Sequence, residues 1–559
     1  MRAHSPKKAG PRMKTFRFPR VDIYIIAILF FAATLRLWQL GTIPSGVLSD
    51  EVEIGYIAYS LGKIGVSPYG DTNIFAIQET SGGSRPPLYI YSAVPSVMLF
   101  GLTPFAIRLP SALFGIFSVL IFYLLLQRVF ASALVSKAGA LLFAFNPWAI
   151  QISRQALLES ITLFFVLTGV YAFVRGKDRI WPYLIAAACF IASLFSYDAP
   201  KIFLPPFLLA LMLLYRKKLW RAPKVVGIFL LVMVLGYAFM LHTTFFNLQV
   251  NDFNAVSIFR WADISGTVNT ERELTTAPLW LSGIFHNKVT VIIKNVITSY
   301  ASIFSLNWFF VNGAGNLQHS VARHGEFFLF ELPLFFFGLA AMLSGNAAGG
   351  TLFLLWLMIG ALPGGLTTTN SPLRSVLMLP APLAISALGF SSMMRRLERC
   401  SNNIRRIFFV LRAGILCLYV TSFLFTYFFD YPVYASEWWS KQQDDAIRFV
   451  IEKKQAYPHV FINGRWRIMY AFFAQIDPAL VLASSKRQET YNTVPVISLG
   501  NVIFGDFSQA TKDFASPSAF FPKGSLLITD GDKFPHETPL KDFLDPGGVR
   551  ILYKAIEVR

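Results

Sequence analysis

An aspartate and a glutamate, Asp50 and Glu51, stand side by side directly after the first long apolar run of the chain. Ser49 before them is a typical helix N-cap, and residues 54–64 continue with apolar residues at helical spacing. The two acids can therefore be capping charges that complement the helix dipole. Carboxylates beside hydrocarbon are costly, however, and tend to be functional. We therefore treat Asp50 and Glu51 as candidate catalytic residues.

Arg85 ends the same polar segment, in residues 82–87 (GGSRPP), and the aromatic run 88–91 follows. An arginine held at the stiff Pro-Pro start of an interfacial helix is suited to a lipid phosphate, although a plain membrane anchor would have the same composition. A second polar pair, Arg154 and Glu159, lies at the start of a later apolar run. Glu159 is either a solvated helix-end charge or a further site residue.

Basic residues and histidines at the ends of later apolar runs complete the candidates. Lys201 and Arg374 either bind an anionic group or simply extend their charged ends to the membrane surface. His319, Arg323 and His324 are candidate substrate contacts, with solvation at the surface as the alternative. The two histidines have no nearby third ligand, so their spacing does not make a persuasive zinc site.

The composition places these residues in a membrane protein. Of the 559 residues, 54% are hydrophobic and 14% are charged, and the mean hydropathy is +0.52. Soluble chains average about 45–50% apolar and about 25% charged residues. These values exclude a soluble enzyme, a disordered protein and a fibrous protein. The chain is expected to be an α-helical protein that crosses the membrane many times.

A bilayer core of about 30 Å requires about 17–25 apolar residues per helix. Eleven runs meet this requirement with ragged ends: residues 21–40, 105–127, 134–150, 157–174, 180–197, 199–215, 225–241, 327–343, 352–366, 374–393 and 406–429.

Two further apolar runs, 88–101 and 289–311, are expected to lie on or dip into the outer surface as juxtamembrane helices. The first is short and contains Pro95, and the second contains Lys294 and Asn295. Counting the second as a span would also place the arginines of 395–406 on the outer side.

The charge pattern predicts the orientation. With a cytoplasmic N-terminus, the basic tail 1–20 and every second connection are rich in Lys and Arg except 344–350, as the positive-inside rule requires, so the net charge of +19 mostly marks the cytoplasmic face. The outward segments are then a first loop at 41–104, a short second loop around 151–157 that leads to Glu159, a large loop at 243–326 and residues 430–559. The three cysteines lie in or beside apolar runs, so no disulfide framework is expected in the outward part. No Asn-x-Ser/Thr sequon occurs, which favours a bacterial or archaeal membrane over a eukaryotic secretory one, and the cytoplasmic membrane of a bacterium is the expected location.

Residues 430–559 change character and are expected to form a small extracytoplasmic α/β domain. An amphipathic helix is predicted at 444–455, and strands at 459–463, 494–504, 526–529 and 550–558. This part has no Gly-rich phosphate loop and no nucleophile motif. Binding of an acceptor and scaffolding both remain open as its role.

The order of motifs resembles a known family. The acidic pair is followed by RPPLYIY (85–91), IRLPSALFG (107–115), NPWAIQISRQALLES (146–160) and SPLRSVLMLP (371–380). This order is similar to that of the C-superfamily (GT-C) membrane glycosyltransferases, and most of all to bacterial protein O-mannosyltransferase-like and aminoarabinose transferase-like members. The resemblance is good early in the chain and looser later, and it implies that residues 21–429 are a transmembrane glycosyltransferase domain with the GT-C fold.

The resemblance also implies an activity: transfer of a sugar from a polyprenyl-phosphate carrier to an acceptor on the extracytoplasmic face. The catalytic aspartate of the family matches Asp50, and the acid after it matches Glu51. A basic residue of the family matches Arg85, although relatives often have lysine or histidine there. Glu159 falls where relatives usually have aspartate, which leaves its contact or metal role open.

The chemistry of such a transfer fits the residues. A polyprenyl phosphate leaves as a stable anion and requires cations, which Arg85, Lys201 and Arg374 can supply. Asp50 can act as general base on an acceptor hydroxyl or amine, which gives inversion in a single displacement. A divalent cation shared by Glu51 and Glu159 is a further hypothesis, and the cofactor otherwise stays unknown.

The expected partners are the lipid-linked sugar donor, the bilayer and an acceptor that is a glycan, a lipid or a protein; nucleic acid is not expected. The main alternative is a transporter or lipid-linked sugar flippase. Such proteins often have paired halves and ionisable residues in mid-span, and the sequence shows neither clearly. A third interpretation is a scaffold protein without catalytic activity. The intact acidic pair argues against it.

Overall fold

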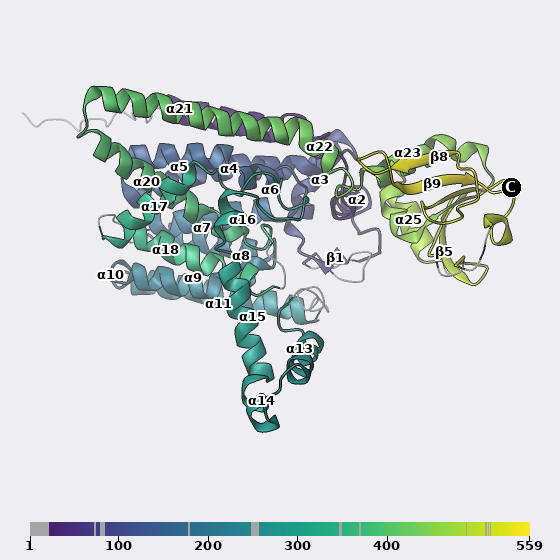
Figure 1. Ribbon diagram of the computed structural model, residues 1–559, viewed down its shortest axis with the longest axis horizontal. Coiled ribbons are helices and arrows are strands. Elements are labelled where there is room, and N and C mark those ends of the chain that lie inside the picture. The colour runs from purple at the N-terminus through teal and green to yellow at the C-terminus, as the bar shows by residue number, and fades with distance from the viewer. Residues whose placement is uncertain are drawn as a thin grey trace, which may run out of the picture.

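The structure is a computed structural model that describes residues 22–559 except 72–73, 76, 79–83, 177–178, 247–256, 346–348, 368–370, 488, 509–510, 513 and 515. The predicted basic tail 1–20 therefore lies outside the described residues. Figure 1 shows a long helical bundle, a β-containing domain at one end of it, and a helical arm that projects from its side.

Eleven helices gather in the bundle, and each coincides with one of the eleven predicted spans (Figure 1). Their ends differ from the predicted ends by a few residues to about a turn or two. The helices are α1 (Ile23–Leu37), α4 (Pro104–Phe130), α5 (Ala133–Phe145), α7 (Glu159–Arg175), α8 (Trp181–Leu194), α9 (Ala199–Leu214), α11 (Pro223–Phe246), α17 (Glu331–Leu343), α18 (Gly350–Gly360), α20 (Pro380–Leu397) and α21 (Asn402–Phe425).

Close backbone approach holds part of this bundle together. A Cβ atom at Gly389 of α20 would stand 1.8 Å from the carbonyl oxygen of Leu334, and one at Gly338 of α17 would stand 1.9 Å from that of Ile385. Small residues at helix crossings permit such packing where lipid supplies no hydrophobic driving force. The glycines therefore fix the crossing of α17 and α20.

Five stretches among the described residues are long and apolar enough to cross a bilayer, while seven further apolar helices have 10–17 residues. The five are Pro104–Phe130, Pro223–Thr243, Leu279–Phe310, Val376–Leu397 and Arg405–Tyr434. The chain is thus a helical membrane protein, and the number of helices that cross the bilayer stays a prediction.

One of these five stretches lies only partly in the bundle. Leu279–Phe310 is divided into α14 (Leu279–Phe285), α15 (Lys288–Ser302) and α16 (Leu306–Phe310). Together with α13 (Trp261–Glu273), α14 and α15 form the arm, which runs across the direction of the bundle helices (Figure 1). Whether residues 289–311 lie along the membrane surface stays a prediction, since Leu279–Phe310 is also long and apolar enough to cross a bilayer.

The first predicted outward loop begins at one end of the bundle. It contains α2 (Ser49–Ile64), a short hairpin of β1 (Ile77–Gln78) and β2 (Ser84–Arg85), and α3 (Leu88–Phe100). Helix α3 is the predicted juxtamembrane helix of residues 88–101. Gly65 ends α2 with a left-handed backbone, φ +75°, which a residue without a Cβ adopts at little cost.

The C-terminal part is built on a seven-stranded sheet with the order β4-β5-β6-β3-β7-β9-β8. The central strand β3 pairs in parallel with β6 and β7, and the other neighbours are antiparallel. The strands are β3 (Val460–Asn463), β4 (Glu489–Tyr491), β5 (Val494–Leu499), β6 (Val502–Gly505), β7 (Leu526–Asp530), β8 (Lys541–Leu544) and β9 (Ile551–Glu557).

The predicted elements of this part mostly appear. The helix predicted at 444–455 is α23 (Lys441–Lys453), and the strands predicted at 459–463, 526–529 and 550–558 are β3, β7 and β9. The single strand predicted at 494–504 is wrong, because β5 and β6 are two antiparallel strands. Gly500, with φ +67°, lies in the turn between them.

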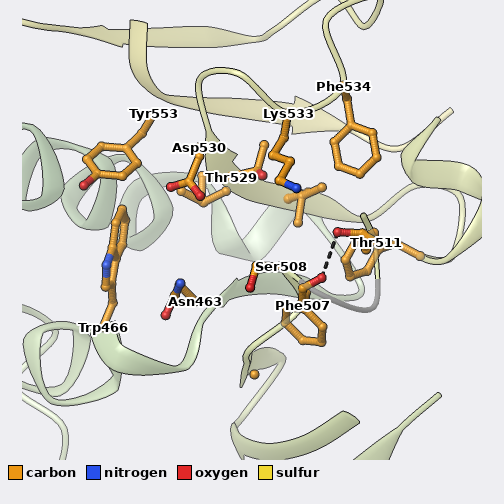
Figure 2. A pocket seen from close by; sticks show the side chains of 14 residues that line it. Asn463, Trp466, Phe507, Ser508, Thr511, Thr529, Asp530, Lys533, Phe534 and Tyr553 are labelled. Atoms are coloured by element: carbon orange, nitrogen blue, oxygen red, sulfur yellow. Dashed lines mark hydrogen bonds between the residues drawn. The ribbon is translucent and has the colours of Figure 1, made fainter. Parts of the chain in front are cut away.

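A small cleft opens where the parallel strands of this sheet end. Asn463, Gly505 and Asp530 close β3, β6 and β7 there, and Trp466 and Tyr553 form one wall (Figure 2). Sheets of this kind often bind ligands at this edge. The open volume is only about 40 Å³, however, which suits a few water molecules. The cleft as it stands therefore gives no support to the predicted binding of an acceptor by this domain.

The sheet domain and the first outward loop share one hydrophobic core. Buried residues of α2 and α3 cluster with buried residues of α23 and of the sheet. The Val47 amide donates to Asp444 Oδ2 at 3.1 Å, and a Cβ at Gly46 would stand 1.9 Å from the carbonyl oxygen of Trp439. The C-terminal segment therefore holds the loop that carries Asp50 and Glu51.

Candidate active site at the end of the helical bundle

Asp50 lies in the first turn of α2, where its side chain is 54% exposed. Its Oδ1 accepts a hydrogen bond from Arg85 Nη2 at 2.7 Å. The N-terminus of α2 and the arginine both place positive charge beside this carboxylate. Asp50 is thus an accessible anion with a cation beside it.

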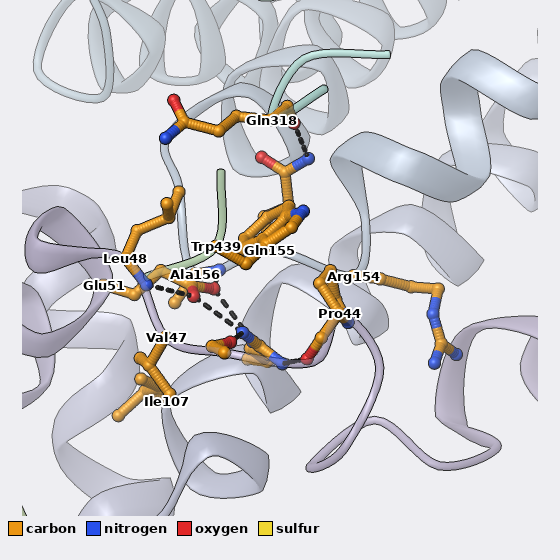
Figure 3. A network of polar contacts seen from close by, with 12 residues as sticks. Pro44, Val47, Leu48, Glu51, Ile107, Arg154, Gln155, Ala156, Gln318 and Trp439 are labelled. Atoms are coloured by element: carbon orange, nitrogen blue, oxygen red, sulfur yellow. Dashed lines mark hydrogen bonds and ion pairs between the residues drawn. The ribbon is translucent and has the colours of Figure 1, made fainter. Parts of the chain in front are cut away.

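Glu51, the next residue, is fully buried and makes four hydrogen bonds. Arg108 donates to it twice, from Nε to Oε1 at 2.9 Å and from Nη2 to Oε2 at 2.7 Å. The backbone amides of Leu48 and Ala156 donate to the same two oxygens at 3.2 and 2.7 Å (Figure 3). Arg108 also donates to the carbonyl oxygens of Pro44 and Gly46. Glu51 therefore joins α2, α4 and the start of the loop.

This network bears on the hypothesis of a shared metal ion. Both carboxylate oxygens of Glu51 are already engaged by Arg108 and by amides, so Glu51 and Glu159 do not offer a cation two free carboxylates. In the part of the chain that the structure describes, no group of three or more His, Cys, Asp and Glu residues could hold a metal ion. The residues present do not fit the predicted metal site.

Arg85 is held between two acids of α2. Besides Asp50, its Nη2 lies 3.5 Å from Glu53 Oε2, and its side chain is 15% exposed. Glu53 in turn accepts a hydrogen bond from the Tyr69 hydroxyl at 2.6 Å. Asp50 and Glu53 are three residues apart and hence on one helix face. The guanidinium is thus fixed over the start of α2.

Glu159 begins α7 and is buried close to the same group. Its charge interacts with those of Asp50 and Arg374, and also with Tyr197. One of its oxygens, Oε2, has no hydrogen-bond partner among the described residues. The structure therefore brings Asp50, Arg85, Glu159 and Arg374 to one region at the end of the bundle, as the sequence suggested.

Lys201 and His319 border this region. Lys201 Nζ forms an ion pair with Asp198 Oδ1 at 2.6 Å, just after Tyr197. His319 Nδ1 lies 3.1 Å from Ser371 Oγ. Burial, together with the charge of Arg374, lowers the pKa of His319 to about 4. This imidazole is therefore neutral at pH 7, able to accept or donate a hydrogen bond without adding positive charge.

We expect His319 to make the folded protein less stable as the pH falls from 6.5 towards 4. The folded state resists protonation until about pH 4, whereas the unfolded chain takes up the proton near the ordinary pKa, so acid favours unfolding. In His319→Asn, the midpoint of thermal unfolding should depend less steeply on pH in this window. His536→Asn, at an exposed histidine, is the control and should match the parent. If the midpoint of thermal unfolding depends equally steeply on pH in the parent and in both variants, His319 has no such effect.

The other three predicted residues have their contacts elsewhere. Arg154 is buried, donates to the carbonyl oxygens of Leu35 and Ile43, and packs against the rings of residues 427 and 428. Arg323 lies 4.3 Å from the ring centre of Tyr434, and His324 contacts the side chains of residues 423 and 426. These residues join the loops to the end of α21 and the segment after it.

Sequence reasoning missed Arg108, Glu53 and Tyr197. A signal existed for Arg108, because an arginine inside a predicted span must have a partner, and the acids of the preceding loop, Glu51 among them, were candidates. Glu53 lies one turn from Asp50 and could have been grouped with it by helical spacing. Tyr197 had no signal beyond its place at a span end.

Part of the chain is similar in sequence to proteins named as mannosyltransferases. Residues 26–261 match the family model described as dolichyl-phosphate-mannose-protein mannosyltransferase. The putative mannosyltransferase YycA of Bacillus subtilis (strain 168) is 25% identical over 228 residues, which are 40% of this chain and 31% of that protein. Protein O-mannosyl-transferase 1 of Rattus norvegicus is 27% identical over 161 residues, which are 28% of this chain and 21% of that protein. The matches thus span about a third of these relatives or less.

The fold is similar over a much longer stretch. The crystal structure of ArnT from Cupriavidus metallidurans bound to undecaprenyl phosphate aligns with a TM-score of 0.51 and 13% identity, covering 95% of this chain and 97% of that one. The resemblance inferred from the motifs is therefore confirmed: residues 26–261 form a region similar to the dolichyl-phosphate-mannose-protein mannosyltransferases, within a chain that has the fold of a C-superfamily membrane glycosyltransferase.

Proposed function

We propose that this protein transfers a sugar from a polyprenyl-phosphate-linked donor to an acceptor at the outer face of the membrane. The observation that carries the proposal is the accessible Asp50 carboxylate with Arg85 Nη2 at 2.7 Å, at the end of a bundle of apolar helices. The fold shared with ArnT, which was solved with undecaprenyl phosphate, supports a lipid-linked donor.

In this proposal Arg85 exchanges partners when the donor binds. The donor phosphate competes with Asp50 for the guanidinium, because both are oxyanions that pair with it well. Binding of the phosphate leaves the Asp50 carboxylate to accept a proton from the acceptor. Arg85 thus serves as the cation that stabilises the leaving group, with Arg374 as a second source of positive charge nearby.

The reaction is then a single displacement. An acceptor oxygen or nitrogen forms a bond to the anomeric carbon of the sugar, while the bond from that carbon to the phosphate oxygen breaks. The acceptor proton passes to Asp50, and the electron pair of the broken bond stays on the polyprenyl phosphate. Attack from the face opposite the phosphate inverts the configuration at the anomeric carbon.

The proposed orientation follows from the charge pattern. The N-terminus and the ends of the bundle that carry Arg128 and Arg396 face the cytoplasm, and Asp50 and the sheet domain face outward. Glu51 acts as a positioning residue, since its bonds with Arg108 fix the turn that carries Asp50. The proposed location is the cytoplasmic membrane of a bacterium.

The direct test is incubation of the purified protein in lipid nanodiscs with polyprenyl-phosphate mannose, chosen because the curated relatives are named mannosyltransferases. Glycan, lipid and peptide acceptors are supplied in separate reactions, and donor consumption is measured by mass spectrometry. Formation of a glycosylated acceptor with inverted configuration supports the proposal. Movement of the donor between leaflets without its consumption would instead support a lipid-linked sugar flippase.

We expect Arg85→Ala to raise the KM for the lipid-linked donor by about 10–100-fold, because a hydrogen bond to a charged group contributes about 1.5–3 kcal/mol. Arg374→Ala should act in the same direction with a smaller effect, since it lies further from Asp50. Arg260→Ala, at an exposed arginine paired with Asp263 on the arm, is the control and should leave KM unchanged. Unchanged donor affinity in Arg85→Ala would remove Arg85 from the phosphate site.

A further inference from the structure

A polar cavity lies at the opposite end of the bundle from Asp50. Its volume is about 660 Å³, and it is lined by the last residues of α4, α7 and α9, by α10 (Arg216–Leu219), and by the first residues of α18. Because α4 and α9 begin at the Asp50 end and finish here, the length of the bundle separates the two sites (Figure 1). The transfer reaction makes no use of this cavity.

The ionisable residues that line the cavity are basic or phenolic. Arg128, Lys218 and Arg221 are the three cations, and neither aspartate nor glutamate is among the lining residues. Lys218 Nζ donates to the Val174 carbonyl oxygen at 3.0 Å and lies 5.4 Å from the centre of the Tyr215 ring. In the part of the chain that the structure describes, the side chains of Arg128 and Arg221 make no hydrogen bond or ion pair. Two guanidinium groups are thus free to bind an anion.

The start of α18 adds to the positive potential. Gly349 and Thr351 line the cavity, and the first free amides of this eleven-residue helix lie at the same place. The N-terminus of a helix carries a partial positive charge of about half an elementary unit. The helix end and the two free arginines therefore point to the same kind of ligand, an anion that accepts several hydrogen bonds.

An apolar groove continues from this cavity along the bundle. Its wall on α9 consists of Pro206, Leu209, Ala210 and Leu213, which recur at helical spacing, and Leu355 of α18 forms the other side. The groove and the cavity share Leu214, Tyr215 and Lys218. The wall on α9 is about 10 Å long, from the rise of 1.5 Å per residue. The cationic cavity, which could hold a lipid head group, thus opens directly onto the apolar groove.

We infer that this cavity and groove bind one anionic phospholipid of the membrane leaflet at that end of the bundle. The phosphate group pairs with Arg128 and Arg221 near the start of α18, and one acyl chain lies along α9. Basic pockets between transmembrane helices bind anionic lipid head groups in this way. The site is distinct from the proposed donor site in its position and in its residues.

The test is native mass spectrometry of the full-length protein, stripped of lipid in a non-ionic detergent and titrated with dioleoyl phosphatidylglycerol. One molecule of dioleoyl phosphatidylglycerol should bind per protein, and it should bind more tightly than dioleoyl phosphatidylcholine. The double variant Arg128→Ala/Arg221→Ala should weaken binding of this lipid by about 30-fold, at about 1 kcal/mol for each cation. The charge-matched control Arg396→Ala/Arg399→Ala removes two exposed arginines at the same end, outside the cavity, and should change binding less than twofold.

The contrary outcomes are defined in the same experiment. An equal loss in both double variants would show a general effect of charge and would overturn the site. Equal binding of phosphatidylcholine and phosphatidylglycerol would overturn it as well. The midpoint of thermal unfolding is measured for both double variants and for the parent. A variant that unfolds at the same temperature as the parent has lost binding without losing its fold.

A separate arm distinguishes a lipid from a free phosphate compound. Leu209→Trp/Leu213→Trp fills the groove and should weaken binding of phosphatidylglycerol at least fivefold, while glycerol 1-phosphate binds as before. If glycerol 1-phosphate binds as tightly as the phospholipid, and the tryptophans change neither ligand, the occupant is a soluble phosphate compound. That result would overturn the assignment to a lipid.

Discussion

Asp50→Asn is expected to lower kcat for sugar transfer by about 10²–10⁴-fold, the usual contribution of a general base. The asparagine keeps the size and polarity of the side chain but cannot accept the acceptor proton. Because Asp50 is half-exposed and its ion pair with Arg85 lies at the surface, the fold should hardly be affected. The rate of donor consumption, measured for the variant and the parent at saturating donor, gives the ratio of their kcat values.

Two measurements make this expectation specific. Asp263→Asn, at an exposed aspartate paired with Arg260 on the arm, is the matched control and should retain full activity. The KM for the donor in Asp50→Asn should fall or stay constant, since the loss of the carboxylate frees Arg85 for the phosphate. Turnover within tenfold of the parent would show that another group accepts the proton.

The largest effect on stability is expected from breaking the buried pair of Glu51 and Arg108. Removal of one partner leaves a buried charge without compensation, which typically costs about 3–5 kcal/mol. Arg108→Ala and Glu51→Ala should therefore each lower the midpoint of thermal unfolding strongly. Both variants should also lose activity in proportion to the unfolded fraction, because the turn that carries Asp50 depends on this pair.

A double variant separates the role of the pair from a direct role of Glu51 in the chemistry. Glu51→Leu/Arg108→Met replaces both charges by apolar side chains of similar size and should recover much of the stability lost in either single variant. If Glu51 only positions α2, activity should return together with stability. Recovery of the fold without any activity would show that the Glu51 carboxylate takes part in the reaction.

The helices were predictable because each apolar run carries its own signal. A bundle helix such as α4 is specified by residues within it, so that length and hydropathy locate it without knowledge of its neighbours. The short polar strands β4 and β8 had no such signal, since three or four residues on a sheet edge show little alternation. The turn at Gly500 was overlooked because apolar residues continue on both sides of it.

The site was predictable only in part. Asp50 and Glu51 were found as a pair, yet their roles could not be told apart from the sequence. Successive residues of a helix point about 100° apart, so one of the two can face the core while the other faces the exterior. Which of them does so depends on Arg108, 57 residues further along the chain, and hence on the packing of α2 against α4.

The remaining differences have a similar cause. Arg154 looked like a site residue because it stands at a span end beside Glu159, but its side chain turns towards the backbone of residues 35 and 43. Two residues that are close in sequence at the start of a helix, such as Arg154 and Glu159, need not have side chains that meet in space. Only the resemblance of motif order, and not spacing, suggested that Asp50 and Arg85 would meet.

The core shared by the first outward loop and the sheet domain has a consequence for biosynthesis. In the proposed orientation, residues 47–107 reach the outer side of the membrane before the ribosome has made residues 446–555, which complete their core. The loop must therefore remain exposed, with its apolar residues unburied, throughout insertion of the later helices. In this orientation the active region is completed only after β9 has been exported, so a stop codon before β9 should yield an inactive, protease-sensitive product.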